Sequence, residues 1–281
     1  MSIVFPFSHL NTPNAATTYH ALFPEIGTVT LIGAGNVAAW LAFALKKANI
    51  SISQIYSRSL KKSEKIAETC GAMAIDDLRK LREGSDLYLF SLKDDAYEEV
   101  VKEIPMQLPF ALLTSGTVSQ RVLAPIAQRF GILYPCQTLS VGMDFSQVQV
   151  PICVEGADSQ TEEQIFRLAG QLTDSVVRMD EAARQQLHLA AVFACNFSNA
   201  LYGIAFDILK NANIDPRILL PLLQNTLNKL QTLSPKEAQT GPAVRGDQSV
   251  MDRHLALLDD EQKRQIYGIM SAYIQNQRDN K

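Results

Sequence analysis

The sequence predicts an α/β domain with a mainly parallel sheet, followed by an all-α C-terminal domain. A chain of 281 residues exceeds what one ordinary core accommodates, which favours two domains. Apolar runs with strand character alternate with helical patterns up to about residue 157, which is typical of a parallel sheet with right-handed crossovers. After about residue 180 the strand signals stop. We therefore expect a leader over 1–25, an α/β domain over 26–157 and a helical domain over 158–281.

The α/β pattern begins with a strand at 28–33, which runs into the turn sequence GAGNVA and a helix over about 36–48. A second strand at 52–57 precedes a charged helix that Gly71 stops. The remaining strands of this half are expected at 85–92, 110–116, 131–140 and 148–156, with a helix at 95–104.

The second half begins with Asp180, which is a typical N-cap for a helix over 181–212. Asp215-Pro216 predicts the start of another helix, and Pro221 indicates a kink or a later start. A Gly/Pro loop over 234–249 separates these helices from two closing helices at 250–260 and 261–277.

Composition excludes several classes of function. The net charge is −3 and no basic face or nucleic-acid motif occurs, so we expect no nucleic-acid partner. The four cysteines form no CxxC pair and have no histidine at zinc spacing, so we expect no metal site. Without a secretory signal, free thiols indicate a reducing, cytoplasmic location.

Residues 187–206 come nearest to a membrane span. His188, Asn196 and Asn199 interrupt this run, and such groups are costly in hydrocarbon. The run therefore favours a buried helix of a soluble protein with no membrane partner.

The turn after the first strand predicts a phosphate-binding cradle. Gly33 and Gly35 occupy the first two positions of G-x-G-x-x-G/A, and Ala38 occupies the third. The helix that opens at Asn36 and Val37, after Ala34 and Gly35, offers free N–H groups and a positive dipole end to phosphates. The strand before the motif and the helix after it give the arrangement of a Rossmann dinucleotide-binding domain.

The end of the second strand indicates which dinucleotide binds. An acidic residue usually holds the ribose there, but this chain has Ser57, Arg58 and Ser59. A carboxylate would repel a 2′-phosphate, whereas a guanidinium pairs with it. The hypothesis is NADP rather than NAD as cofactor, and the alternative is that Arg58 belongs to a solvated helix start. Because ligands lie beyond the carboxyl ends of strands, we also expect Ser91, Leu92, Ser115 and Gly116 to border the cofactor.

Polar residues in the long apolar helix suggest a catalytic group. On an ideal α-helix, Asn199 lies about 20° and Asn196 about 80° from His188 around the axis. Buried polar groups need partners, which a substrate or a neighbouring backbone could provide. His188 is the candidate proton donor or acceptor, because imidazole titrates near neutrality.

Two further segments supply candidate substrate-binding groups. Gln137 follows the strand in YPCQTLS. In TGPAVRGDQSVMDRH, Arg245 could hold a carboxylate in a fork, while Asp247, upstream of His254, equally suits an N-cap.

These motifs together resemble a known group, the Rossmann-like proteins that carry a C-terminal domain of unknown function. That group is similar to the 6-phosphogluconate dehydrogenase-like superfamily, which includes pyrroline-5-carboxylate reductase and deazaflavin-dependent NADP reductase. The resemblance implies a two-domain NADP-type oxidoreductase and a homodimer joined through the helical domain. Those relatives often carry a lysine and an asparagine on the long helix. No lysine occurs between Glu181 and Asp207, so His188 would have to act instead.

Two functions remain open. The first is an NADP(H)-dependent oxidoreductase that transfers hydride to or from a small carbonyl, imine or alcohol, with His188 as the catalytic acid or base. The second is an NADP(H)-binding sensor or assembly protein without turnover, because fold does not imply function.

Overall fold

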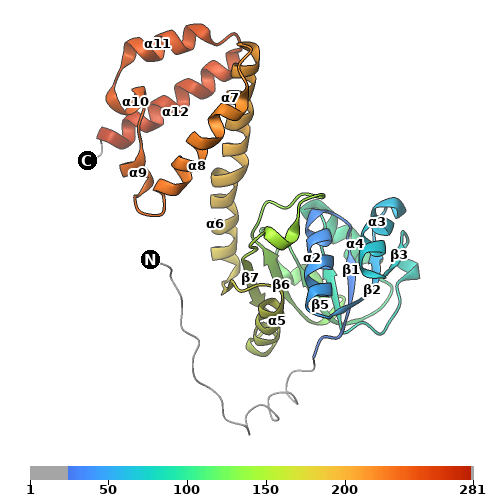
Figure 1. Cartoon of the computed structure of the whole chain (residues 1–281). Helices are drawn as coiled ribbons and strands as arrows, with labels where there is room; N and C mark the ends of the chain where they lie inside the picture. Colours follow the sequence, from blue (N-terminus) through green and yellow to red (C-terminus); the bar gives the residue numbers. More distant parts are fainter. Residues whose placement is uncertain (1–24, 280–281) are drawn as a thin grey trace. The chain divides into compact units, whose positions relative to one another are not determined.

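The computed structural model of the chain describes residues 25–279, and the expected leader lies outside them apart from Glu25. The described residues form two compact units, which divide between Phe193 and Ala194. The first unit is built around one eight-stranded sheet (Figure 1). Its strands are β1 (Thr28–Ile32), β2 (Ser51–Tyr56), β3 (Met73–Ile75), β4 (Leu87–Phe90), β5 (Leu108–Leu113), β6 (Ala127–Pro135), β7 (Ile152–Gly156) and β8 (Val176–Arg178).

The sheet has the order β3-β2-β1-β4-β5-β6-β7-β8. Every neighbouring pair is parallel except β6 and β7. The expected Rossmann-like α/β fold is therefore confirmed. After β3 the chain returns to the other side of β1, so the direction of sheet growth reverses between β1 and β4. Ligands of such sheets bind at this reversal, beyond the carboxyl ends of the strands.

Helices cover both faces of the sheet. The α-helices of this part are α2 (Asn36–Lys47), α3 (Leu60–Cys70), α4 (Tyr97–Glu103) and α5 (Ser159–Leu172), and short 3-10 turns are η1 (Leu78–Lys80), η2 (Asp94–Ala96), η3 (Gln120–Leu123) and η4 (Phe145–Gln147). Alternate residues of the strands point to opposite faces of the sheet and form two apolar layers. Helices α2, α3 and α5 pack on one layer, and α4 packs on the other. Both layers anchor the loops at the sheet's carboxyl edge.

The first unit continues beyond the expected domain boundary at residue 157. Helix α5 contacts β6 and β7, and the chain then adds β8 parallel to β7. The strand β8 has three residues, which is too short to give an alternation signal in the sequence. Helix α6 (Glu181–Ala191) completes the unit, and Asp180 caps it as predicted, accepting a hydrogen bond from the Ala183 N–H.

The second unit is helical, as expected. It continues the long helix through η5 (Val192–Phe197), a π-helical turn, into α7 (Ser198–Asn211). The elements that follow are η6 (Pro216–Leu219), α8 (Leu220–Lys229), α9 (Pro235–Ala238), α10 (Pro242–Arg245), α11 (Gln248–Leu257) and α12 (Glu261–Asp279). Pro221 lies in the first turn of α8, so the later start that it allowed is the one adopted.

The expectation of a buried helix over 187–206 is wrong for the single chain. Residues 181–211 form one helix that is long and apolar enough to cross a membrane by length and composition, a test that core helices of soluble proteins also pass. None of its apolar window is buried. The side chains of Leu189, Phe193 and Phe197 are more than half exposed.

Candidate functional site

The turn after β1 is shaped for a glycine at its first position. Gly33 adopts φ +123°, in the region that favours glycine, and its N–H donates to the Tyr56 carbonyl at 2.8 Å. A Cβ at this position would lie 2.0 Å from the Ser91 carbonyl oxygen. The turn therefore brings the ends of β1 and β4 into direct contact, at the point where the sheet order reverses.

The first turn of α2 is open to an anion. Its N-cap, Gly35, supplies no capping side chain, and no acidic residue lies in the first turn. A Cβ built at Gly35 would meet no atom within 4 Å, so space lies over the helix N-terminus. The uncapped N–H groups and the helix dipole suit a phosphate there. Ala38, by contrast, is fully buried and serves the close packing that its motif position predicts.

A cavity of about 650 Å³ lies over this turn, at the ends of β1, β2 and β4. It brings together ten of the residues expected to hold the cofactor. These are Gly33, Ala34, Gly35, Asn36, Val37, Ser57, Arg58, Ser59, Ser91 and Leu92. Its volume is within the range of small-molecule and cofactor sites.

The cavity is cationic at the end of β2. Arg58 lines it together with Lys62 and Lys93, and Arg58 forms no ion pair with any described residue. Ser57 and Ser59 add hydroxyl groups beside it. An unpaired guanidinium with neighbouring hydroxyls can hold a phosphate monoester in a bidentate fork.

Ser115 and Gly116 do not line this cavity, and the Ser115 hydroxyl is used inside the fold. The Ser115 hydroxyl donates to Asp94 at 2.8 Å and accepts from the Thr117 and Val118 N–H groups. The Thr117 hydroxyl donates to the other oxygen of Asp94. The Ser115 side chain thus shapes the loop at the end of β5, and the expectation that Ser115 borders the cofactor stays a prediction.

His188, on α6, packs against the loop that follows β5. A Cβ at Gly116 would come within 2.6 Å of the His188 Nδ1 atom, so the ring packs against the Gly116 backbone. The Tyr134 hydroxyl, from the end of β6, lies 3.2 Å from Nδ1, and the two rings meet edge to face. Burial raises the pKa of Tyr134, and the neighbouring Cys136 raises it further. The phenol therefore stays protonated and can donate to Nδ1.

Tyr134 occupies only one of the two ring nitrogens of His188. Its hydroxyl can donate to Nδ1 of a neutral ring or accept from Nδ1–H, and in both cases Nε2 is left for a ligand. Nearby Cys153 is unsuited to nucleophilic chemistry, because burial raises its pKa to about 11 and keeps the thiol protonated.

Gln137 has internal partners. Its amide Nε2 donates to the Gln149 carbonyl at 2.9 Å, and its Oε1 accepts from the Thr138 N–H. It thus closes the loop between β6 and β7. The Val141 N–H in this loop donates to the Asn36 side chain at 3.3 Å, so the loop reaches the cradle.

The predicted polar stripe of His188, Asn196 and Asn199 crosses a π-helical turn, so the angles of an ideal α-helix do not apply to it. Both asparagines are exposed, and Asn196 lies inside the π-helical turn η5. A π turn holds more residues than an α turn, so a constant 100° per residue does not hold across it. The two asparagines belong to the second unit, whereas His188 belongs to the first.

The remaining candidates also lie in the second unit. Arg245 is exposed at the end of α10. Asp247 caps α11 by accepting a hydrogen bond from the Val250 N–H, so it has the N-cap role that the sequence also suggested. His254 Nδ1 lies 2.9 Å from the Tyr267 hydroxyl.

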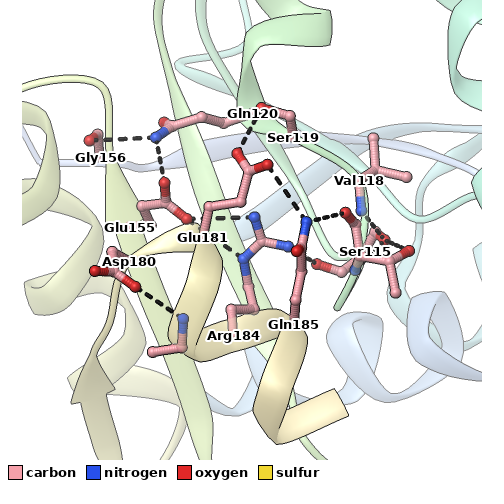
Figure 2. A network of polar contacts seen from close by, with 12 residues as sticks. Ser115, Val118, Ser119, Gln120, Glu155, Gly156, Asp180, Glu181, Arg184 and Gln185 are labelled. Atoms are coloured by element: carbon pink, nitrogen blue, oxygen red, sulfur yellow. Dashed lines mark hydrogen bonds and ion pairs between the residues drawn. The ribbon is translucent and has the colours of Figure 1, made fainter. Parts of the chain in front are cut away.

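Sequence reasoning missed three residues of the His188 region. Tyr134 stands in the quoted YPCQTLS strand end but was not singled out. Arg184 lies one helical turn before His188, and Figure 2 shows it joined to Glu155 of β7. The spacing of Arg184 and His188 puts both on one helix face, and this spacing is the signal that the sequence offers for Arg184.

Two family models match the chain. Residues 28–117 match the family described as NADP oxidoreductase coenzyme F420-dependent, and residues 150–274 match a domain of unknown function, DUF2520. A crystal structure from Bacteroides fragilis, described as an NADP oxidoreductase, is 34% identical over 89% of this chain and 98% of its own, with a TM-score of 0.85. The chain is therefore of the NADP oxidoreductase class. It belongs to the family in which this N-terminal domain is joined to DUF2520.

More distant structures share the fold alone. A pyrroline-5-carboxylate reductase from Streptococcus pyogenes is 16% identical over 89% of this chain and 98% of its own, with a TM-score of 0.61. An imine reductase from Myxococcus stipitatus, in complex with NADP⁺, is 17% identical over 90% of this chain and 93% of its own, with a TM-score of 0.57. No curated protein gives a significant match.

Proposed function

We propose that the chain is an NADP(H)-dependent oxidoreductase that acts on a small carbonyl, imine or alcohol. The observation that carries the proposal is the cavity at the sheet reversal, where the open α2 N-terminus and the unpaired Arg58 suit a diphosphate and a 2′-phosphate. Family membership with NADP oxidoreductases supports the same cofactor. The bound nicotinamide ring would supply or accept the hydride.

The chain's own residues would then position and protonate the substrate. Gly116 and His188 lie at the carboxyl end of β5, on the same sheet edge as the cavity. As imidazolium, His188 would give the Nε2 proton to the substrate oxygen or nitrogen during reduction and become neutral imidazole, and the neutral ring would take the proton back during oxidation. The Tyr134 hydroxyl would accept a hydrogen bond from Nδ1–H of the imidazolium and hold the ring in place.

Binding and turnover test the two parts separately. We expect NADPH to bind more tightly than NADH in a fluorescence titration, and NADPH to be consumed with at least one member of a panel of aldehydes, ketones and cyclic imines. His188→Ala should slow turnover strongly and leave NADPH affinity nearly unchanged. Gln186→Ala, an exposed change on the same helix, is the matched control. Tight NADPH binding with no turnover across the panel would favour the sensor instead.

A homodimer through the second unit completes the proposal. Among its described hydrophobic residues only Ala243 and Met251 are buried, whereas Ile218, Leu257 and Ile269 are more than two-thirds exposed. Helices with so little buried apolar surface need a covering partner in water. A second copy supplies one, because a two-fold interface covers the same patch on both chains.

Light scattering at micromolar concentration tests the dimer. We expect twice the chain mass for the wild type, and monomers or aggregates for Ile269→Glu. Leu60→Glu, at an exposed position of the first unit, should remain dimeric. A detergent-dependent monomer would instead favour insertion of the 181–211 helix into a bilayer.

A further inference from the structure

Arg184 is the only charged side chain of the described residues that is buried, and its exposed fraction is 0%. It lies on the second turn of α6, one turn before His188. A buried guanidinium is tolerated only when its hydrogen-bonding groups find partners. The partners that it finds connect three segments of the first unit.

Figure 2 shows these partners. The Nε and Nη2 atoms of Arg184 approach one oxygen of Glu155, on β7, at 3.4 and 3.3 Å. Its Nη1 atom donates to the Ser115 carbonyl at 3.2 Å. The second oxygen of Glu155 accepts from the Gln120 amide at 2.8 Å. One side chain thus joins α6, β7 and the loop after β5.

Two neighbours on α6 bind the same loop. The Ser119 hydroxyl donates to Glu181 at 2.7 Å, and the Gln185 amide donates to the Thr117 carbonyl at 3.3 Å. Positions 181, 184, 185 and 188 follow the spacing of one helix face. The helix face that carries His188 therefore lies along residues 115–119, with Arg184 as its buried centre.

The contact with the Ser115 carbonyl also orients Gly116. A trans peptide is planar, so the carbonyl of Ser115 and the N–H of Gly116 point in opposite directions. With the carbonyl on Arg184, the N–H points away from it, and this N–H donates to no other group of the described residues. Gly116 is buried, so its free N–H needs an acceptor that a ligand could provide.

We propose that Arg184 is a positioning residue, which holds the His188 ring and the Ser115–Gly116 peptide in fixed register for the bound substrate. The proposal rests on the proposed function, since it assigns a role in the same site. Arg184 touches neither substrate nor cofactor in this role. It acts through the helix and the loop that it joins.

A double substitution tests this role without leaving a lone buried charge. Arg184→Met/Glu155→Gln removes both charges together and keeps an acceptor for Gln120, so the fold should survive. Arg178→Met/Glu163→Gln removes an exposed arginine–glutamate pair of the same unit and is the matched control. Arg184→Lys, which keeps the charge but loses the fork, gives a second variant if the double variant does not fold.

The first readout needs neither cofactor nor substrate. In the NMR spectra of the full chain, the His188 Cε1–H resonance, assigned with His188→Gln, and the Gly116 amide resonance should both move in the Arg184 variants. They should keep their wild-type positions in the control. Unchanged resonances in a folded Arg184 variant would overturn the proposal, even if the wild type turns over no substrate in the panel.

The second readout is the division between binding and catalysis. Misplacement of a catalytic group by about 1 Å costs on the order of 100-fold in rate. We expect such a loss of kcat on any substrate accepted by the wild type, an NADPH Kd within about threefold, and partial recovery in Arg184→Lys. An equal loss in the control, or a loss in NADPH affinity alone, contradicts a positioning role. Absence of turnover in the wild type would refute the hydride-transfer proposal alone.

Discussion

Gly116 and His188 are packed so tightly that no side chain fits between them. A Cβ at Gly116 would come within 2.6 Å of Nδ1 and 3.0 Å of the Tyr134 Cζ atom. The glycine therefore sets the height of the imidazole above the end of β5. The position of the His188 ring therefore depends on residue 116 being a glycine as well as on the hydrogen bond to Tyr134.

Gly116→Ala should displace His188 and its hydrogen bond to Tyr134. Overpacking of this kind costs about 1–3 kcal/mol of unfolding free energy, and we expect turnover to fall on the order of 100-fold from the altered geometry. Gly170→Ala on α5, where a Cβ meets nothing within 4 Å, should be neutral or up to about 1 kcal/mol more stable. Denaturant unfolding and NADPH consumption measure both. Full activity in Gly116→Ala would show that the ring position is not critical.

The two glycines of the cradle should respond differently to alanine. Gly33→Ala forces a positive φ and a 2.0 Å contact with the Ser91 carbonyl, so the first unit should lose stability before any ligand is added. Gly35→Ala has free space in the cofactor-free chain, so its unfolding midpoint should stay close to wild type. Its methyl group would occupy the space of the phosphates, and NADPH affinity should fall. Normal NADPH binding by Gly35→Ala would place the diphosphate elsewhere.

Arg58→Gln should change cofactor preference. Charge-assisted hydrogen bonds contribute about 1.5–3 kcal/mol, which corresponds to roughly 10- to 100-fold in Kd. We expect weaker NADPH binding by that factor and unchanged NADH binding, measured by fluorescence titration. Arg79→Gln removes an exposed arginine that is paired with Asp77 and serves as control. Parallel weakening of both nucleotides would contradict a 2′-phosphate contact.

Glu155 should make stability depend on pH in a definite direction. Burial raises the pKa of its carboxyl, and the Arg184 guanidinium opposes this only in part. Between the unfolded value, about 4.3, and the raised folded value, the folded chain binds more protons than the unfolded one. The contribution is thus complete below the unfolded pKa and is lost as pH rises through the folded pKa.

Urea unfolding of the wild type and of Glu155→Gln, followed from about pH 4 to neutrality, isolates this contribution. The wild-type advantage in unfolding free energy should shrink as pH rises. An advantage that grows with pH would mean that attraction to Arg184 outweighs the burial of the carboxylate.

The residues of the cradle could be located from the sequence because their signals are local. Gly33 directly follows β1, Gly35 lies two residues further on, and Arg58 lies two residues after the end of β2, so a short window contains each signal. The capping aspartates Asp180 and Asp247 were predictable for the same reason, because a cap acts within three residues. Local chemistry and backbone geometry agree at these positions.

The His188 environment could not be predicted in the same way. Tyr134 is 54 positions away from His188 in the chain. Arg184 of α6 binds Glu155 of β7, which is also distant in the sequence. Such contacts depend on which strand ends meet α6, which periodicity does not specify. The angles expected for the asparagine stripe belong to an ideal α-helix, whereas the chain forms a π turn there.

The six residues of η5 have one further consequence, for insertions and deletions rather than substitutions. A widened turn absorbs one extra residue, so removal of one residue from this stretch should close it into regular α-helix and leave the side chains of α7 close to their present directions around the axis. Shortening the stretch between Val192 and Phe197 by one amino acid should therefore be better tolerated than a deletion elsewhere in the long helix.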